Sequence, residues 1–262
     1  VTGASGQGHE TSFSHIIERE LGFPAQQVRY LNGTPDSKKL VGNGTGGSRT
    51  LYGAGSAILN LAQQIKAKVT ELRAQLKLPT EHSHDWSWLT QLTPQQRDTL
   101  SAMGEASSGA TFPNGCHVAE IEIDPQTGRT QVLQYWAVDD LGKVISPDLV
   151  RGQVHGGVVQ GWGQAFCEQV VYDEQGQLVT GSFMDYAMPR LGDMPVIRNE
   201  TVEVTTELNA LGSKGVGESG CSGSLPALAN AVISVLREYG VTGMDMPYTP
   251  PKVWAALQNR KP

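Results

Sequence analysis

Hydrophobic residues return every three or four positions in several segments, and this spacing predicts amphipathic helices. One stripe lies within residues 13–21, and the glycine and proline that follow it are typical of a helix end. A longer stripe runs through 51–72. We also predict a short helix at 94–103, a glycine-rich helix at 150–170, and a helix that begins near Glu218.

Other segments alternate apolar and polar residues, which predicts β-strands. Residues 117–124 place acidic side chains on one face and apolar ones on the other. The apolar ones are Ala119, Ile121 and Ile123. The turn sequence PQTG joins this segment to 129–140, so we expect an antiparallel hairpin. Shorter strands are predicted at 1–3, 26–31 and 201–208, with another hairpin turning at 172–177.

The predicted helices and strands do not alternate regularly, which favours an α+β fold over a parallel βαβ arrangement. We expect glycine-rich loops that lead into helices, together with antiparallel hairpins. Residues 1–75 form one expected subdomain, 76–115 an irregular insertion or boundary, and 116–262 a second subdomain. The chain opens at Val1 as if at the end of a strand, so we expect it to be the later part of a longer protein.

Composition limits the classes of function. The 262 residues are 39% hydrophobic and 18% charged, with a net charge of −6. An acidic chain without a basic stripe is a poor match to nucleic acid, and no apolar run approaches the length of a membrane span. Cys116, Cys167 and Cys221 lie too far apart for a CxxC metal site, so we expect buried apolar roles and no iron–sulfur cluster in this chain.

Glycine-rich segments precede three of the predicted helices, at 5–9, 42–48 and 215–223. Free backbone amides at a helix start favour anions, so three such loops indicate one large anionic ligand. A dinucleotide fingerprint is disfavoured, because no strand leads into the GxGxxG match at 42–47. A phosphate-binding P-loop fails because Arg49 follows Ser48, and the nucleophile motif GxSxG is absent around Glu218.

Two simpler interpretations remain open at this point. The glycines of 153–164 can either allow close packing of a helix or contact a ligand. Glu218 can be a solvated carboxylate that interacts with a helix dipole, which contributes about 0.3–1 kcal/mol.

Five motifs, taken in order, resemble one family. They are GQGHET at 6–11, GTGGSRT at 44–50, the stretch 137–165, KGVGESG at 214–220, and PYTPPKVWAAL at 247–257. Together they resemble the molybdenum-binding (molybdopterin) subunit of the xanthine oxidase family, which includes aldehyde oxidoreductases and aerobic carbon monoxide dehydrogenase. The resemblance covers nearly the whole chain except 76–112, and it implies the C-terminal portion of a molybdopterin-binding domain.

The resemblance implies a set of site residues. Glu218 corresponds to the catalytic base beside molybdenum, and no side chain of this chain is expected to ligate the metal directly. The cofactor-binding residues implied are Gly6, Gln7, Gly8, His9, Gly44, Thr45, Gly46, Gly47, Ser48, Arg49, Thr50, Gln153, Lys214, Gly215, Val216 and Gly217.

The resemblance also implies a cofactor and partners. We expect molybdopterin with molybdenum, in the cytosine dinucleotide form, and hydroxylation of an electron-poor carbon in an N-heterocycle or aldehyde. Expected partners are a chain with the N-terminal half of the molybdenum subunit, a [2Fe–2S] subunit and an FAD subunit. The expected location is cytoplasmic, with the periplasm as the alternative. Two other functions stay open: a non-catalytic cofactor-binding half, and an unrelated nucleotide-binding protein.

Overall fold

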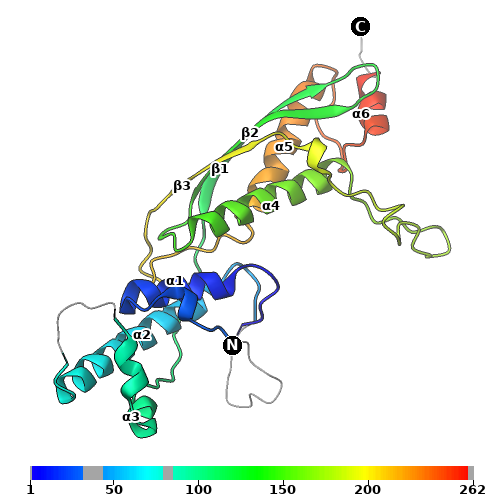
Figure 1. Ribbon diagram of the computed structural model, residues 1–262. Coiled ribbons are helices and arrows are strands. Elements are labelled where there is room, and N and C mark those ends of the chain that lie inside the picture. The colour runs from blue at the N-terminus through cyan, green and yellow to red at the C-terminus, as the bar shows by residue number, and fades with distance from the viewer. Residues whose placement is uncertain (1, 32–43, 79–84, 259–262) are drawn as a thin grey trace. The chain divides into compact units, whose positions relative to one another are not determined.

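The computed structural model describes residues 2–31, 44–78 and 85–258 (Figure 1). Its α-helices are α1 (His9–Leu21), α2 (Thr50–Gln75), α3 (Pro94–Thr99), α4 (Pro147–Phe166), α5 (Ser219–Arg237) and α6 (Pro250–Leu257). Short 3-10 helices are η1 (Ala25–Gln27), η2 (Ser87–Gln91) and η3 (Leu191–Asp193). The strands are β1 (Asn114–Ile123), β2 (Thr130–Asp140) and β3 (Ile197–Val202).

The chain forms two compact units, and each unit is built from three separate segments of the chain. Unit 1 comprises Val1–Phe112, Leu141–Leu149 and Glu203–Gly215. Unit 2 comprises Pro113–Asp140, Val150–Val202 and Val216–Pro262. Two segments from the second half of the chain therefore belong to the same unit as α1 and α2.

Unit 1 is built on the packing of α1 against α2. Phe13 and Ile16 of α1 meet Leu59 of α2, and Leu211 from the returning segment completes this core. A Cβ added to Gly55 would lie 2.7 Å from Leu211, so a glycine lets the returning segment approach α2. A second cluster lies farther along α2 and consists of Val69, Leu72, Trp88 and Leu92.

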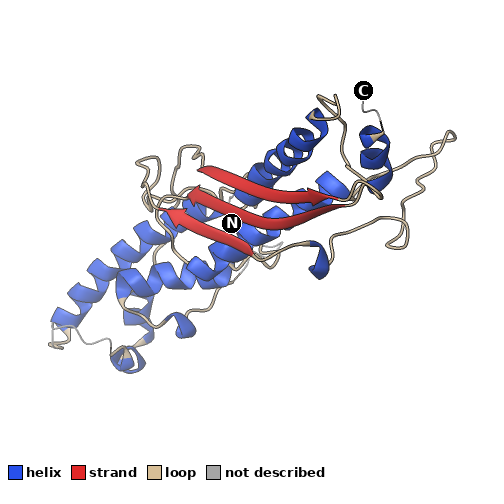
Figure 2. Ribbon diagram, turned by 90° about the horizontal axis from the view of Figure 1, so that it is seen from above, coloured by secondary structure: helices blue, strands red, loops and turns tan. Residues whose placement is uncertain are grey.

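Unit 2 is a three-stranded sheet covered on one face by helices (Figure 2). β1 and β2 are antiparallel, with His117 opposite Ala137, and β3 runs parallel to β2. Tyr135 of β2, Val154 of α4 and Leu228 of α5 are fully buried in the shared core. The alternation of β1 is confirmed by its packing. Ala119, Ile121 and Ile123 contact this core.

The sheet and the main helices confirm the predicted α+β class, and several local predictions are wrong. Residues 26–31 form η1 and irregular chain, because no neighbouring strand pairs with them in the described part of the chain. The predicted strand 201–208 lies too late, since β3 ends at Val202. The predicted hairpin at 172–177 is present, closed by a single antiparallel bridge between Tyr172 and Leu178. Residues 2 and 3 belong to no strand, and residue 1 lies outside the described residues.

Two further expectations change with the structure. Cys116 is exposed rather than buried, because it lies at the polar start of β1, whereas Cys167 and Cys221 are half-buried. α5 is long and apolar enough to cross a membrane by length and hydropathy. Its Leu228, Val232 and Leu236 are fully buried, so core packing accounts for that apolar face.

Candidate functional site

The first glycine loop precedes α1 in unit 1 and is shaped by its own polar groups. Gly6 and Gly8 have φ angles of 92° and 76°, which side chains rarely tolerate. The backbone N–H of Ser5 donates to Oε1 of Gln7 at 2.5 Å, and Nε2 of Gln7 donates to the carbonyl of Gly3 at 3.3 Å. The amide of Gln7 therefore holds the loop in shape.

The second glycine loop, described from Gly44 onward, precedes α2 and is bonded to the first loop. Gly42, part of the dinucleotide-like match, lies outside the described residues. Thr45 Oγ1 donates to the carbonyl of Gly3 at 2.7 Å, and Thr50 Oγ1 donates to Thr45 Oγ1 at 3.3 Å. Two loops separated by more than forty positions in the chain are thus joined directly.

The third loop reaches the second through Gly215. A Cβ added to Gly215 would overlap the carbonyl oxygen of Ser48 and lie 2.7 Å from its Cβ. The Gly215 N–H donates to Thr111 Oγ1 at 3.3 Å, and the Lys214 N–H donates to the carbonyl of Leu141 at 2.8 Å. Unit 1 therefore brings together three of the predicted segments, namely 6–9, 44–50 and 214–215.

The glycines of these loops differ in why they are glycine. Gly44 and Gly47 have φ angles of 63° and 60°, so the backbone alone requires them. Gly46 has no such angle, and among the described residues an added Cβ would meet no atom within 4 Å. The backbone at Gly46 is therefore open, which is compatible with a cofactor held by loop amides.

His9 lies at the start of α1 and is the predicted site residue most deeply packed in loop 6–9. Its ring is buried and stacks on Phe13 with 5.4 Å between ring centroids. Burial lowers the pKa of His9 below its usual value, which favours the neutral ring. Its Nδ1 atom is buried and has no hydrogen-bond partner in the described part of the chain. An orphaned polar atom beside this loop also fits a ligand that supplies the missing bond.

Glu218 lies in unit 2 and is the N-cap residue of α5. Its side chain is exposed, and it does not cap the helix by a side-chain hydrogen bond. Glu218 follows Gly215 by three positions, through Val216 and Gly217. Burial and the negative charge of Glu218 both raise the pKa of the Cys221 thiol, which lies one turn into α5.

The start of α5 packs closely on α4, and this explains the helix glycines. A Cβ added to Gly157 would lie 2.7 Å from the backbone nitrogen of Cys221, and one added to Gly161 would overlap Ser224. Of the two interpretations of 153–164, packing therefore accounts for Gly157 and Gly161. Gln153 is half-buried and one helical turn before Gly157, on the side of α4 that faces the start of α5.

A buried polar cluster joins β1 and β2 in unit 2, and sequence reasoning missed it. His117 Nδ1 lies 2.8 Å from the hydroxyl of Tyr135, and His117 Nε2 lies 3.3 Å from Oδ1 of Asp139. The side chains of His117 and Asp139 are only 3% and 4% exposed. The available signal was the position of His117, which has the same parity as the apolar residues of β1.

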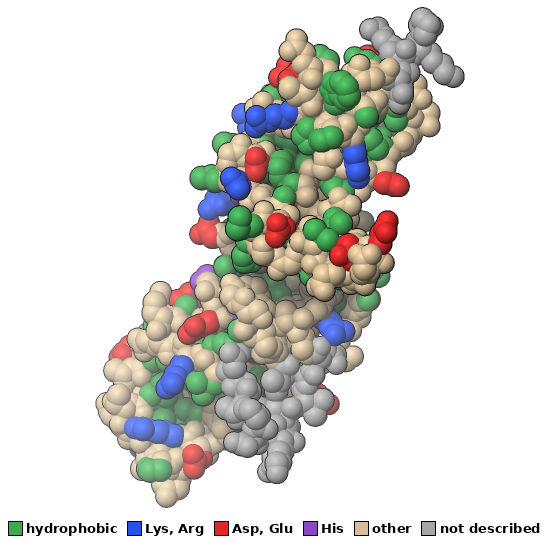
Figure 3. Space-filling model, turned by 90° about the vertical axis from the view of Figure 1, so that its right-hand side faces the viewer, with side chains coloured by type: hydrophobic (Ala, Val, Ile, Leu, Met, Phe, Trp, Pro, Cys, Tyr) green, Lys and Arg blue, Asp and Glu red, His purple; other side chains and the backbone are tan. Residues whose placement is uncertain are grey.

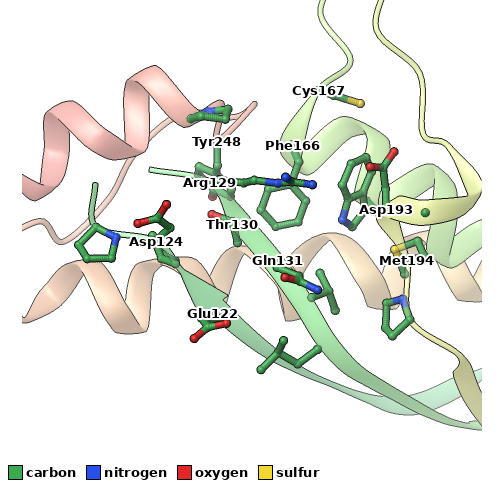
Figure 4. A pocket seen from close by; sticks show the side chains of 18 residues that line it. Glu122, Asp124, Arg129, Thr130, Gln131, Phe166, Cys167, Asp193, Met194 and Tyr248 are labelled. Carbon is green, nitrogen blue, oxygen red and sulfur yellow. The ribbon is translucent and has the colours of Figure 1, made fainter. Parts of the chain in front are cut away.

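The structure also contains a pocket of about 780 Å³ in unit 2 (Figure 4). Glu122 and Asp124 come from the end of β1 and the turn that follows it, and Asp193 comes from η3 on the other side. None of the predicted cofactor residues lines it. Among the described residues, no group of His, Cys, Asp or Glu side chains is arranged to hold a metal ion.

Known proteins share the sequence features and the fold of this chain. A family described as "Molybdopterin cofactor-binding domain" matches residues 2–195. The chain is 31% identical to the carbon monoxide dehydrogenase large chain of Hydrogenophaga pseudoflava, over 97% of this chain and 34% of that protein. Identity to the nicotine 6-hydroxylase large subunit of Paenarthrobacter nicotinovorans is also 31%, over 97% and 34%.

Solved structures agree with the sequence relatives. Quinoline 2-oxidoreductase from Pseudomonas putida 86 matches with a TM-score of 0.82 and 31% identity, over 99% of this chain and 36% of that one. A Cu,Mo-CO dehydrogenase matches with a TM-score of 0.87 and 30% identity, over 98% and 35%. The chain thus spans about a third of the length of these relatives. It belongs to the molybdopterin cofactor-binding domain family, among the molybdenum-binding subunits related to xanthine dehydrogenase and carbon monoxide dehydrogenase.

Proposed function

We propose that this chain is the cofactor-binding and base-carrying part of a molybdenum hydroxylase that acts on an electron-poor carbon, with water as the source of oxygen. The observation that carries the proposal is the convergence of three loops in unit 1 near Gly46, where no described atom lies within 4 Å of an added Cβ. The hydroxylases and dehydrogenases among the relatives support the reaction class.

In this proposal the loops hold the cofactor through backbone. The amides and hydroxyls of 44–50 bind the phosphates of the dinucleotide form, and the turn at 6–9 lies against the pterin. Lys214 adds positive charge next to the loop that carries Gly215. Because the phosphate groups are anionic, the positive ends of the helix dipoles at the starts of α1 and α2 favour them.

Glu218 is the proposed general base. Its carboxylate accepts a proton as water supplies the oxygen that is transferred to the substrate carbon, and it returns that proton to solvent. Such a base accelerates a reaction by about 10²–10⁴. When bound, molybdopterin with molybdenum supplies the two-electron redox chemistry, while the chain supplies position and electric field. We further propose the cytosine dinucleotide form, [2Fe–2S] and FAD partners, and a cytoplasmic location.

The cofactor class is tested on the complex as purified. We expect about one molybdenum per copy of this chain by elemental analysis, and release of CMP on acid hydrolysis. Magnesium or zinc without molybdenum, or a bound purine nucleotide that turns over, would instead indicate an unrelated nucleotide-binding protein.

The role of Glu218 is tested by Glu218→Gln, which keeps the size of the side chain and removes its basicity. We expect unchanged molybdenum content and a kcat at least 100-fold lower. Glu238→Gln, at the opposite end of α5, is the matched control and should leave kcat unchanged. Full activity of the molybdenum-loaded Glu218→Gln variant would assign this chain a cofactor-binding role without catalysis.

A further inference from the structure

The segment between α4 and β3 extends from the body of unit 2 as an arm, residues 168–196 (Figures 1 and 2). Its largest apolar side chains are almost completely exposed. Phe183 is 87% exposed, Met184 96% and Leu191 99%. Figure 3 views the protein from the side toward which the arm extends, and hydrophobic side chains appear there among acidic ones. Exposed apolar clusters of this kind mark interaction sites.

The arm has a defined local structure. Gly176 has a φ angle of 79° at the turn, and the Val179 N–H donates to the carbonyl of Val171 at 2.8 Å. Nearer its base, the hydroxyl of Tyr186 donates to Glu168 at 2.7 Å, and this bond raises the pKa of Tyr186. The polar groups of the arm thus bond within the arm, while its apolar groups face outward. A segment that is stabilised by its own packing buries its apolar side chains, whereas the arm exposes them. Its internal hydrogen bonds hold the backbone in one shape, and such preorganisation lowers the entropic cost of docking.

The base of the arm meets the pocket of unit 2. Cys167, Gly192 and Asp193 line that pocket, together with Trp162 and Thr130. Trp162 Nε1 and Thr130 Oγ1 are buried and have no hydrogen-bond partner in the part of the chain that the structure describes. Buried polar groups are usually bonded to protein or to ordered water, so a segment that enters this pocket can supply the partners of these two atoms.

We propose that the arm and the pocket at its base form one docking surface for the polypeptide that supplies the remaining two-thirds of the molybdenum subunit. The inference rests on the proposed function. The occupant follows from length, since the chain covers 34–36% of its relatives and a large part of each relative has no counterpart here. Charge supports the same occupant. The arm has five acidic residues and one arginine, which disfavours a second copy of the arm or an anionic membrane.

Photocrosslinking of the whole purified complex tests the occupant. Phe183→p-benzoylphenylalanine is expected to crosslink to sequence outside residues 1–262 of the same molybdenum subunit, located by mass spectrometry. Arg237→p-benzoylphenylalanine, at the polar end of α5, is the control and should give no such product. Crosslinks from position 183 to a second copy of this chain, to another subunit or to lipid would overturn the proposal, as would no crosslink despite full incorporation.

Limited proteolysis of the complex gives a second readout that does not depend on crosslinking. The double variant Phe183→Ser/Leu191→Ser should raise cleavage within 168–196 at least tenfold, which corresponds to about 1.4 kcal/mol of lost docking. Gln169→Ser, a polar change in the same arm, should leave cleavage unchanged. An unchanged rate in the double variant would contradict the proposal. Molybdenum content and kcat are measured on the same preparations, so a loaded, active complex with misplaced crosslinks would refute only the docking surface.

Discussion

Gly46 offers the sharpest separation of cofactor contact from fold stability. Among the described residues, a Cβ added at position 46 would meet no atom within 4 Å, and no positive φ opposes it. Gly46→Ala should therefore leave the free energy of unfolding within about 0.5–1 kcal/mol of wild type, with any change stabilising. Gly215→Ala is the contrasting variant, because its Cβ overlaps the carbonyl oxygen of Ser48, and it should cost about 1–3 kcal/mol.

Cofactor binding should respond to position 46 in the opposite sense. If the backbone of Gly46 contacts the cofactor, the valine side chain of Gly46→Val occupies the space of the cofactor and prevents that contact. A loss of at least about 1.4 kcal/mol in binding lowers affinity tenfold. We expect Gly46→Val to fold with wild-type stability and to purify with strongly reduced molybdenum and CMP.

The assays are urea unfolding of cofactor-free protein and elemental plus nucleotide analysis of the purified complex. Gly243→Ala, at an exposed position of unit 2 without a positive φ angle, controls for a general effect of replacing glycine. Full cofactor content in Gly46→Val would show that the second loop does not touch the cofactor. A large stability loss in Gly46→Ala would show that the glycine serves the fold instead.

Two further predictions concern stability. His117→Ala leaves the Asp139 carboxylate buried without its partner, so it should cost about 3–5 kcal/mol in urea unfolding, and a cost under about 1 kcal/mol would contradict the cluster. The pKa of His9 is lowered from 6.5, so below that pH the unfolded chain binds a proton that the folded chain does not. Stability should fall as the pH drops below about 6.5 and should fall less in His9→Asn, whereas equal slopes would refute the effect of burial.

The pattern along the chain determined much of the local structure. Apolar stripes predicted α1, α2 and α5, because a helix repeats its buried face every three or four residues whatever lies opposite it. The alternation at 117–124 and its turn predicted the β1–β2 hairpin for the same reason. The motifs of the glycine loops also indicated the family, since their residue types follow from local backbone and ligand demands.

Tertiary structure alone decided what lies beside these elements. Segments 26–31 and 201–208 resemble strands in composition, but a strand needs a paired neighbour that local sequence does not specify. The structure also places Thr45 beside Gly3 and Ser48 beside Gly215. These contacts join segments that lie far apart in the sequence. Likewise, Gly157 and Gly46 are the same residue type. Only the tertiary structure shows that the backbone of α5 lies against Gly157, whereas no described atom lies within 4 Å of a Cβ added to Gly46.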